Sequence, residues 1–379
     1  MRRYKTYING EWFEGTSGIV LRSVDPSNNQ ELGEIVQNSK EDVEYAIESA
    51  SRSFYKTREW RDLDVQQRSD KLLKIADMIE SEIDEIAKTE SMDNGKPLRE
   101  AQADVDDAVH CFRYYAGLIR TPSGQTYNVN SNFGNMHSYT LKEPVGVCAL
   151  ITPWNFPFLM SVWKIAPALA AGNSIIFKPS SETVLSALKL FEILDKCDLP
   201  KGTANLVIGS GSTVGNLLAE SKKVDMITFT GSTSVGQGIM RAAAGNVKKI
   251  GLELGGKSPN IVFADTDIDK TVEWVMMGIF LNQGEVCCAG SRLIIEKSIK
   301  DKFLKKLVER TDKLTLGAPL DNPDMGPLIS KKHMQDVLGY IEKGKAEGAK
   351  LLCGGYKCTD GDLVNGNFIK PAIFDDCTS

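Results

Sequence analysis

Between Val145 and Leu254 the sequence repeats one pattern: a short apolar run, a turn rich in Gly, Pro or Ser, and a helical stretch. The apolar runs read VGVCALI, SIIF, ANLVI, DMITF and KKIGLEL. Strands that alternate with helices form a parallel sheet, because each parallel strand is reached through a crossover helix. The pattern predicts a doubly wound α/β fold, whose ligands bind beyond the carboxyl ends of the strands, where these turns lie.

The first third of the sequence is predicted to be largely helical. SKEDVEYAIESASRSF begins with a capping pattern and repeats apolar residues at helical spacing. A single second helix is expected before DNGKP, and its apolar face carries Leu72, Ile75, Ile79, Ile83 and Ile86. A third amphipathic segment follows to about Gly117.

Residues 123–143 have a different character from the segments on either side. Polar residues, Asn and Gly surround short alternating stretches, which is typical of an exposed hairpin. A hairpin that protrudes from an α/β body often pairs with another subunit, and a simple surface flap is the alternative.

After Gly255 a second αβ region is expected, with apolar runs PNIVF and RLIIE on either side of a helix that ends near Phe280.

The charge balance argues against several classes of partner. The chain has 45 basic and 50 acidic residues and no dense Lys/Arg block, so neither nucleic acid nor an anionic membrane is an expected partner. The window 145–163 is uncharged and nearly long enough to span a membrane, but Pro153, Asn155 and Pro157 lie at its centre. We therefore expect a buried strand, a turn and a buried helix there. The N-terminus lacks a secretory signal, which predicts a cytoplasmic protein.

The eight cysteines are scattered, with no CxxC pair, which favours a reducing compartment over a disulfide scaffold. None of the three histidines has zinc-finger spacing, so no metal site is expected. In GEVCCAGSR, however, Cys287 and Cys288 are adjacent. By itself this pair is compatible with a redox switch, half a metal site, two apolar core residues, or one nucleophile beside an uninvolved neighbour.

The turns after the predicted strands carry the other candidates. GSGSTVG and TGSTSVG follow successive strands, and their backbone N–H groups would suit a phosphate, although glycines also serve ordinary turns. Lys178 follows the run SIIF. It is either a solvated surface lysine or a residue that contacts the ribose or a phosphate of a nucleotide. Glu253 precedes two glycines and is either a turn cap or, in a partly apolar site with a raised pKa, a general base.

Five motifs in this order resemble the NAD(P)-dependent aldehyde dehydrogenase superfamily: PWNFP, FKPS, FTGSTSVG, LELGGKSPNIVF and NQGEVCCAGSR. The resemblance runs from YINGEW to the last residue, and two stretches, REAQADVDDAVHCFRYYAGL and AAGNVKKIGLELGGK, are most similar to the betaine aldehyde dehydrogenase group. It implies a dinucleotide-binding domain over 1–122 and 144–254, an oligomerisation hairpin over 123–143 and a catalytic domain over 255–379. For a full-length chain it also implies a homo-oligomer, either a dimer or a tetramer.

The resemblance assigns the catalytic roles by motif. Cys287 corresponds to the nucleophile, Cys288 to its neighbour, Glu253 to the general base and Asn155 to the oxyanion-binding amide. A thiolate at Cys287 would attack the aldehyde, so nearby positive charge or dipoles are expected to lower the pKa of this thiol. Glu253 would activate the water that hydrolyses the thioester, whereas relatives that acylate coenzyme A lack this base.

The same resemblance implies NAD or NADP as cofactor. Its contacts would include the following residues: Ile151, Thr152, Trp154, Lys178, Ser181, Gly211, Gly231, Ser232 and Val235. Many NAD-preferring relatives carry Glu where this chain has Ser181, and a Lys178/Ser181 pair suits a 2′-phosphate, so use of both cofactors is the hypothesis.

The substrate is an aldehyde whose identity the sequence leaves open. Phe156 and Trp163 are either pocket-lining or core aromatics. Relatives specific for betaine aldehyde tend to have Tyr and Gln where this chain has Phe156 and Met160, which leaves aliphatic and aromatic aldehydes as candidates.

Members of the resembled superfamily continue for on the order of a hundred residues past Ser379. That part would hold the EIFGP motif, whose Glu binds the nicotinamide ribose, together with one wall of the substrate pocket and an oligomerisation strand. Two hypotheses follow: an enzyme that oxidises an aldehyde to a carboxylic acid through a thiohemiacetal and a thioester, or an impaired homologue that still binds the nucleotide. A thiol redox switch at the cysteine pair is a third, minor hypothesis.

Overall fold

The structure, a computed structural model, describes residues 2–121 and 123–378. Its centre is a seven-stranded sheet with the order β12-β11-β8-β9-β10-β2-β3. The five predicted strands are present and mutually parallel, which confirms the doubly wound fold. They are β8 (Val147–Ile151), β9 (Ser174–Lys178), β10 (Ala204–Leu206), β11 (Met226–Gly231) and β12 (Lys249–Leu254). β2 (Thr6–Ile8) and β3 (Glu11–Phe13) complete the sheet as antiparallel edge strands.

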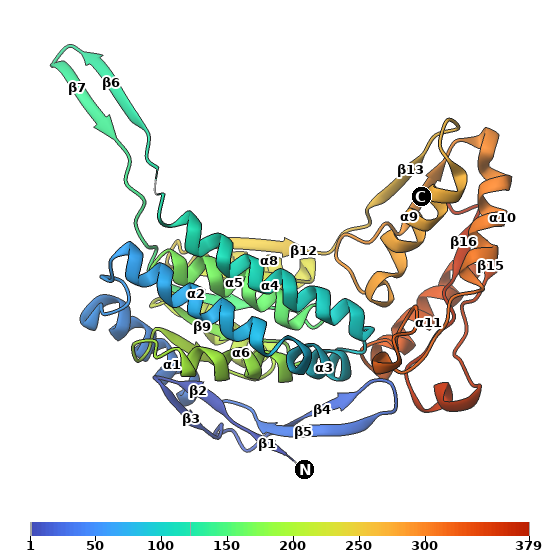
Figure 1. Cartoon of the computed structure of the whole chain (residues 1–379), viewed down its shortest axis with the longest axis horizontal. Helices are drawn as coiled ribbons and strands as arrows, with labels where there is room; N and C mark the ends of the chain where they lie inside the picture. Colours follow the sequence, from blue (N-terminus) through green and yellow to red (C-terminus); the bar gives the residue numbers. More distant parts are fainter. Residues whose placement is uncertain (1, 122, 379) are drawn as a thin grey trace.

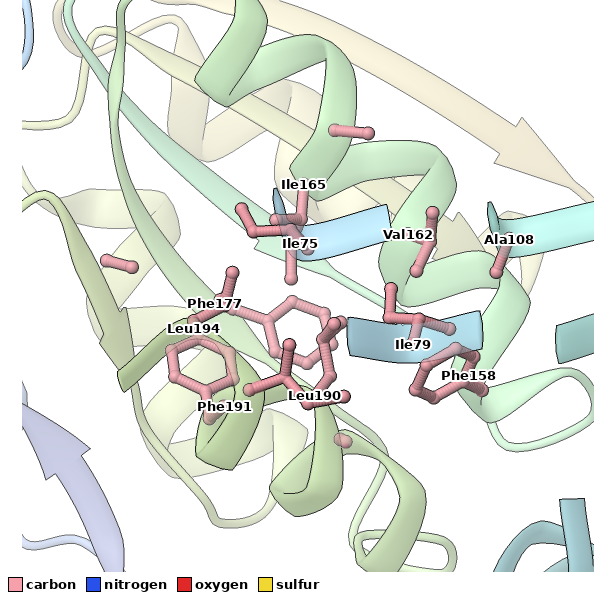
Figure 2. Packing of buried hydrophobic residues seen from close by; sticks show 14 of the residues in the cluster. Ile75, Ile79, Ala108, Phe158, Val162, Ile165, Phe177, Leu190, Phe191 and Leu194 are labelled. Carbon is pink, nitrogen blue, oxygen red and sulfur yellow. The ribbon is translucent and has the colours of Figure 1, made fainter. Parts of the chain in front are cut away.

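Helices cover both faces of this sheet (Figure 1). One face carries α2 (Val65–Ser81), α4 (Leu98–Leu118), α5 (Pro157–Ala170) and α6 (Leu185–Lys196), and the other carries α1 (Lys40–Arg52), α7 (Asn216–Glu220) and α8 (Thr233–Ala243). Alternate residues of β8 enter the two cores: Cys148 and Leu150 face the first, Val147 and Ala149 the second. Figure 2 shows the first core, where Phe177 of β9 meets Phe191 of α6 and Ile165 of α5.

The predicted helix from Leu72 to Ile86 is in fact two helices, so that prediction was wrong. α2 ends at Ser81, Glu82 leaves helical geometry (φ −115°, ψ 15°), and α3 (Ile83–Asn94) begins. After the break, α3 contacts both α4 and α6. The predicted end at DNGKP is confirmed, with Gly95 in the left-handed region at φ 99°. The Ser39 capping box and the third helix are also confirmed.

The predicted hairpin is confirmed as β6 (Thr126–Ser131) and β7 (Gly134–Tyr139), which pair antiparallel and project far from the body (Figure 1). Nearly all of its residues are exposed, including Phe133 at 96%. A separate three-stranded sheet near the N-terminus consists of β1 (Arg3–Tyr4), β5 (Gln30–Val36) and β4 (Val20–Asp25).

The second αβ region follows β12 and is confirmed. β13 (Pro259–Val262) pairs parallel with β14 (Arg292–Ile295), and α9 (Ile268–Phe280) and α10 (Lys300–Thr311) share a core with them. α11 (Lys331–Ala346), β15 (Lys350–Cys353) and β16 (Ile373–Asp375) complete it. Short π- or 3-10 segments are η1 (Ser53–Thr57), η2 (Gly211–Gly215), η3 (Leu281–Gly284), η4 (Lys297–Ile299), η5 (Pro319–Asp321) and η6 (Gly361–Asn365).

Two further properties bear on function. Within 2–121 and 123–378, no helix combines the length and the apolar character needed to cross a membrane. The same residues include no group of three or more His, Cys, Asp or Glu side chains placed to hold a metal ion.

Candidate active site

The loop that carries Cys287 follows α9 and bends sharply. Asn282 and Gln283 both adopt left-handed backbone geometry (φ 47° and 57°) and are buried, although neither is glycine. Glu100 on α4 stabilises the bend, because its carboxylate oxygen accepts a hydrogen bond from the Asn282 N–H over 2.8 Å. Beyond the bend, Cys287 and Cys288 are both exposed residues, so neither belongs to the core.

The pKa of the Cys287 thiol is raised, and the prediction that it is lowered was wrong. Partial burial of the sulfur is the main cause, and the neighbouring Cys288 adds to it. The prediction assumed a cation or a helix dipole beside the sulfur, whereas its nearest titratable neighbour is a second thiol. At neutral pH Cys287 is therefore mostly protonated, and its reactivity depends on a group that removes this proton.

Asn155 lies in the PWNFP turn after β8 and is bonded to the nucleophile loop on two sides. Its side-chain Nδ2 donates to the Glu285 carbonyl over 2.6 Å. Its own carbonyl accepts from Asn282 Nδ2 at 2.7 Å and from Asn94 Nδ2 at 3.4 Å. An amide NH₂ has two N–H donors, and within the described chain only one of these is used. The second is available for an oxyanion.

Glu253 lies near the end of β12, where it is paired with Thr230 of β11, and its side chain is exposed. The chain that follows it reaches the nucleophile, because the Gly256 N–H donates to the Cys287 carbonyl over 3.0 Å. Three elements thus meet here: the turn after β8, the end of β12 and the loop of residues 281–288. The fold brings together the segments that carry all three predicted catalytic residues.

The predicted cofactor residues gather along one edge of the sheet. Ile151 is paired with Lys178 on β9 and with Phe229 on β11. The Thr152 N–H donates to the Lys178 carbonyl at 3.1 Å, and Ser181 Oγ donates to the Gly209 carbonyl at 2.9 Å. The turns after β8, β9 and β10 are therefore contiguous, as the carboxyl edge of a parallel sheet requires.

Lys178 is buried, so its interpretation as a solvated surface lysine was wrong. Its Nζ donates to the Pro179 carbonyl at 2.9 Å, and desolvation lowers the pKa of this ammonium group to about 8. A buried ammonium group beside a sheet edge is costly unless an anion or polar ligand compensates it.

Two more features of this edge fit a dinucleotide. Ser232 caps α8, accepting from the Val235 N–H at 3.4 Å, so the first N–H groups of this helix point out of the turn after β11. Thr152 Oγ1 is buried and has no hydrogen-bond partner in the part of the chain that is described. A Cβ built on Gly211 would meet no atom within 4 Å, which leaves space beside the neighbouring turn.

Comparison with known proteins decides the family. The model described as "Aldehyde dehydrogenase family" matches residues 12–379. The chain belongs to the aldehyde dehydrogenase family. It is 46% identical over 374 residues to the betaine aldehyde dehydrogenase of Bacillus subtilis (strain 168), covering 98% of this chain and 76% of that protein. It is 40% identical to the mitochondrial aldehyde dehydrogenase of Homo sapiens, covering 98% of this chain and 71% of that protein.

A crystal structure of betaine aldehyde dehydrogenase from Staphylococcus aureus in complex with NAD+ superposes with a TM-score of 0.95. Sequence identity is 40%, and the match covers 99% of this chain and 74% of that one. The structure of a putative aldehyde dehydrogenase from Burkholderia cenocepacia gives a TM-score of 0.93 at 37% identity. That match covers 98% of this chain and 75% of the Burkholderia chain. The whole fold of this chain is thus an aldehyde dehydrogenase fold.

The two candidate substrate residues differ in their surroundings. Phe156 is half-buried, and Lys96 Nζ lies 4.2 Å from the centre of its ring. Trp163 on α5 is 52% exposed, so this aldehyde dehydrogenase does not use it as a core aromatic. Trp154, a predicted cofactor residue, has its ring 5.2 Å from that of His333 on α11.

Sequence reasoning missed two ionisable side chains at the site. Lys164 of α5 is buried, and its Nζ donates to Thr228 Oγ1 at 2.9 Å. Burial lowers the pKa of Lys164 to about 8, while the charge of Glu253 acts in the opposite direction. Glu285, two residues before Cys287, is also buried. The sequence features that could have revealed them are a lysine within an apolar helix, for Lys164, and a carboxylate two residues before the nucleophile, for Glu285.

Proposed function

We propose that the chain oxidises an aldehyde to a carboxylic acid with NAD(P)+ by covalent catalysis at Cys287. The observation that supports this most is the pair of contacts that join Asn155 to the Glu285 carbonyl and Gly256 to the Cys287 carbonyl. Together they gather the segments of a nucleophile, an oxyanion donor and a base. Family membership favours this enzyme over an impaired homologue that only binds nucleotide. Formation of NAD(P)H at 340 nm with a panel of aldehydes tests the proposal.

In the first step, the Cys287 thiol gives its proton to a base, either Glu253 or water, and the sulfur forms a bond to the aldehyde carbon. The carbonyl π electrons move to oxygen, which becomes an oxyanion. The second N–H of Asn155 and a backbone N–H near Cys287 would stabilise this charge, since their bonds strengthen as it develops. One such donor contributes on the order of 3 kcal/mol to transition-state stabilisation.

A bound NAD(P)+ would supply the hydride acceptor for the tetrahedral carbon; the oxyanion electrons would then re-form the carbonyl, and a thioester would remain on Cys287. Residues at the carboxyl edge of the sheet, including Thr152, Lys178 and Ser232, would hold the dinucleotide. Glu253 then removes a proton from water, and the water oxygen bonds to the thioester carbon. The carbon–sulfur bond breaks, and the departing sulfur takes up the proton that Glu253 holds. The products are the free acid and the Cys287 thiol.

Asn155→Ala is expected to lower kcat by about 10²–10³-fold, because it removes one preorganised oxyanion donor. KM should change less, since the bond matters most after the oxyanion forms. The measurement is steady-state NAD(P)H formation with a reactive aldehyde. Asn246→Ala is the matched control: its Nδ2 bonds only backbone carbonyls of Lys222 and Val224 in the described structure. Equal kcat values for the two variants would contradict the role of Asn155.

The cofactor is proposed to be either NAD or NADP. Lys178 supplies a buried amine and Ser181 a small hydroxyl at the same edge, where a glutamate would repel a 2′-phosphate. Ser181→Glu is therefore expected to lower kcat/KM for NADP at least tenfold while leaving that for NAD within a few-fold. Kinetics with both cofactors check this. A wild-type preference for NAD above about a hundredfold, some 2.7 kcal/mol, would contradict dual use.

Betaine aldehyde and simpler aldehydes remain competing substrate proposals. Similarity to proteins named betaine aldehyde dehydrogenase favours the first. Phe156 and Met160 favour aliphatic or aromatic aldehydes by the family pattern, since this turn lacks a tyrosine. Relative kcat/KM values across the three classes decide between them.

We also propose a homo-oligomer in the cytoplasm, in which the β6–β7 hairpin pairs with another subunit. The support is its projection from the body with Phe133 and Tyr139 exposed. The proposed domains are a dinucleotide-binding domain (1–122 and 144–254), this hairpin region (123–143) and a catalytic domain (255–379). Sedimentation of the chain with and without the hairpin tests the pairing.

A further inference from the structure

Glu285 is a buried carboxyl group directly beside the nucleophile. It lies between η3 and Cys287, and its side chain is only 2% exposed. Its Oε1 accepts a hydrogen bond from the Ile329 N–H over 3.0 Å. Its Oε2 is buried and lacks a hydrogen-bond partner among residues 2–121 and 123–378. Glutamate is seldom buried in this way without a specific reason.

The residue joins three parts of the site. Its main-chain carbonyl accepts from Asn155 Nδ2 at 2.6 Å, and its N–H donates to the Asn282 carbonyl at 2.9 Å. Its side chain reaches across to Ile329, at the end of the segment that precedes α11. The Asn155 amide therefore points where it does because its acceptor, the Glu285 carbonyl, is fixed in place.

The charged groups around Glu285 do little to favour its ionised form. His333 Nε2 on α11 is 3.6 Å from Oε1, but burial lowers the pKa of that imidazole, so it is mainly neutral at neutral pH. The charge of Lys96 lowers the pKa of Glu285, but its effect is smaller than that of burial. Lys96 Nζ is itself bonded to Glu90 (3.2 Å) and Asp104 (2.6 Å). Glu100 of α4 adds a further carboxylate, bonded to the Asn282 N–H.

Burial outweighs these influences and raises the pKa of Glu285 to about 8. The carboxyl group is therefore mostly protonated at pH 7. In that form it keeps an acceptor oxygen for the Ile329 N–H without adding negative charge beside the Cys287 sulfur. A charged anchor would oppose formation of the thiolate.

We propose that Glu285 is a positioning residue for the reaction: its side chain anchors the nucleophile loop to Ile329 and so fixes the carbonyl that orients Asn155. The inference rests on the proposed function, because it requires Cys287 to be the nucleophile. Loss of the anchor should release the loop, which already contains two residues in the left-handed region. Ionisation of the anchor should make Cys287 harder to deprotonate.

The test compares Glu285→Ala and Glu285→Gln with the wild-type chain. Alanine removes the acceptor for Ile329, so kcat should fall at least tenfold with a smaller change in KM. Glutamine keeps an acceptor oxygen and never ionises, so it should restore most of that loss at pH 7. The matched control is Glu296→Ala, because Glu296 Oε2 also accepts a backbone N–H, from Ala264 at 2.8 Å, but lies after β14.

The second readout is the rate at which iodoacetamide alkylates Cys287, followed by mass spectrometry from pH 6.5 to 10. In Glu285→Gln the rate should rise with pH as a single titration. In the wild type it should lag behind this variant above about pH 8, where Glu285 ionises. A purely structural role would give two parallel profiles.

Two results would overturn the inference: a kcat for Glu285→Ala equal to that of Glu296→Ala, or coincident alkylation profiles for the wild type and Glu285→Gln. If Glu285→Ala fails to fold, the glutamine profile alone decides. Full activity in Cys287→Ser would instead refute the proposed function, which keeps the two failures distinguishable.

Discussion

Cys287→Ser is expected to lower kcat for aldehyde oxidation by on the order of 10⁴-fold or more. The serine hydroxyl keeps nearly the same shape but has a far higher pKa, so no comparable fraction of nucleophile forms at neutral pH. The effect exceeds that of losing an oxyanion donor because no covalent intermediate forms without the sulfur. NAD(P)H formation measures the loss, and cofactor binding by fluorescence titration should be unchanged.

Cys288→Ser is the matched control for the nucleophile. It should keep activity within about threefold, and the pKa of Cys287 should fall slightly, because Cys288 contributes to its elevation. The wild-type rate of Cys287 alkylation should rise with pH above 7, since a raised pKa leaves most of the thiol protonated there. An inactive Cys288→Ser beside an active Cys287→Ser would reverse the roles of the two sulfurs.

The alternation of strands, turns and helices was enough to predict the main sheet. Each apolar run from Val147 to Leu254 was short, bounded by turn residues and followed by a helical period, so local pattern and global fold agree. The break at Glu82 was not predictable in this way. No glycine or proline marks it, and the packing of α3 on α6 joins residues far apart in sequence.

The candidate site was predictable only by motif. Nothing in the spacing of Asn155, Glu253 and Cys287 shows that their segments meet, and family resemblance supplied their roles. The structure adds how they meet, through backbone acceptors: the Glu285 carbonyl for Asn155 and the Cys287 carbonyl for Gly256. Backbone acceptors leave no sequence signature, because every residue has a carbonyl group.

Electrostatic properties were the least predictable part of the site. Lys178 reads as an ordinary charged residue after a strand, yet it is buried with a pKa lowered to about 8. The Cys287 thiol was expected to be acidic, yet its pKa is raised. Both shifts depend on burial and on which groups lie nearby in space, which a linear sequence does not record.

Glu253→Gln is expected to lower steady-state turnover by about 10²–10⁴-fold, because it removes the base that activates water. Glutamine keeps the shape and a hydrogen-bond acceptor but cannot take a proton. Thiohemiacetal formation and oxidation do not require that water, so one equivalent of NAD(P)H per site should still form in a rapid burst. Stopped-flow absorbance at 340 nm measures the burst and the slow phase that follows.

The burst also separates two roles that Glu253 can take. Because the pKa of Cys287 is raised, some group must remove its proton before attack, and the Glu253 segment contacts Cys287 through Gly256. A full burst at the wild-type rate limits Glu253 to hydrolysis, whereas a burst slowed as much as turnover means that it also deprotonates the nucleophile.

Glu296→Gln controls for the substitution itself, because Glu296 is an exposed glutamate after β14. Wild-type turnover in Glu253→Gln would show that another group is the base. Lys164 is one alternative, because its pKa is lowered to about 8 and its charge interacts with that of Glu253.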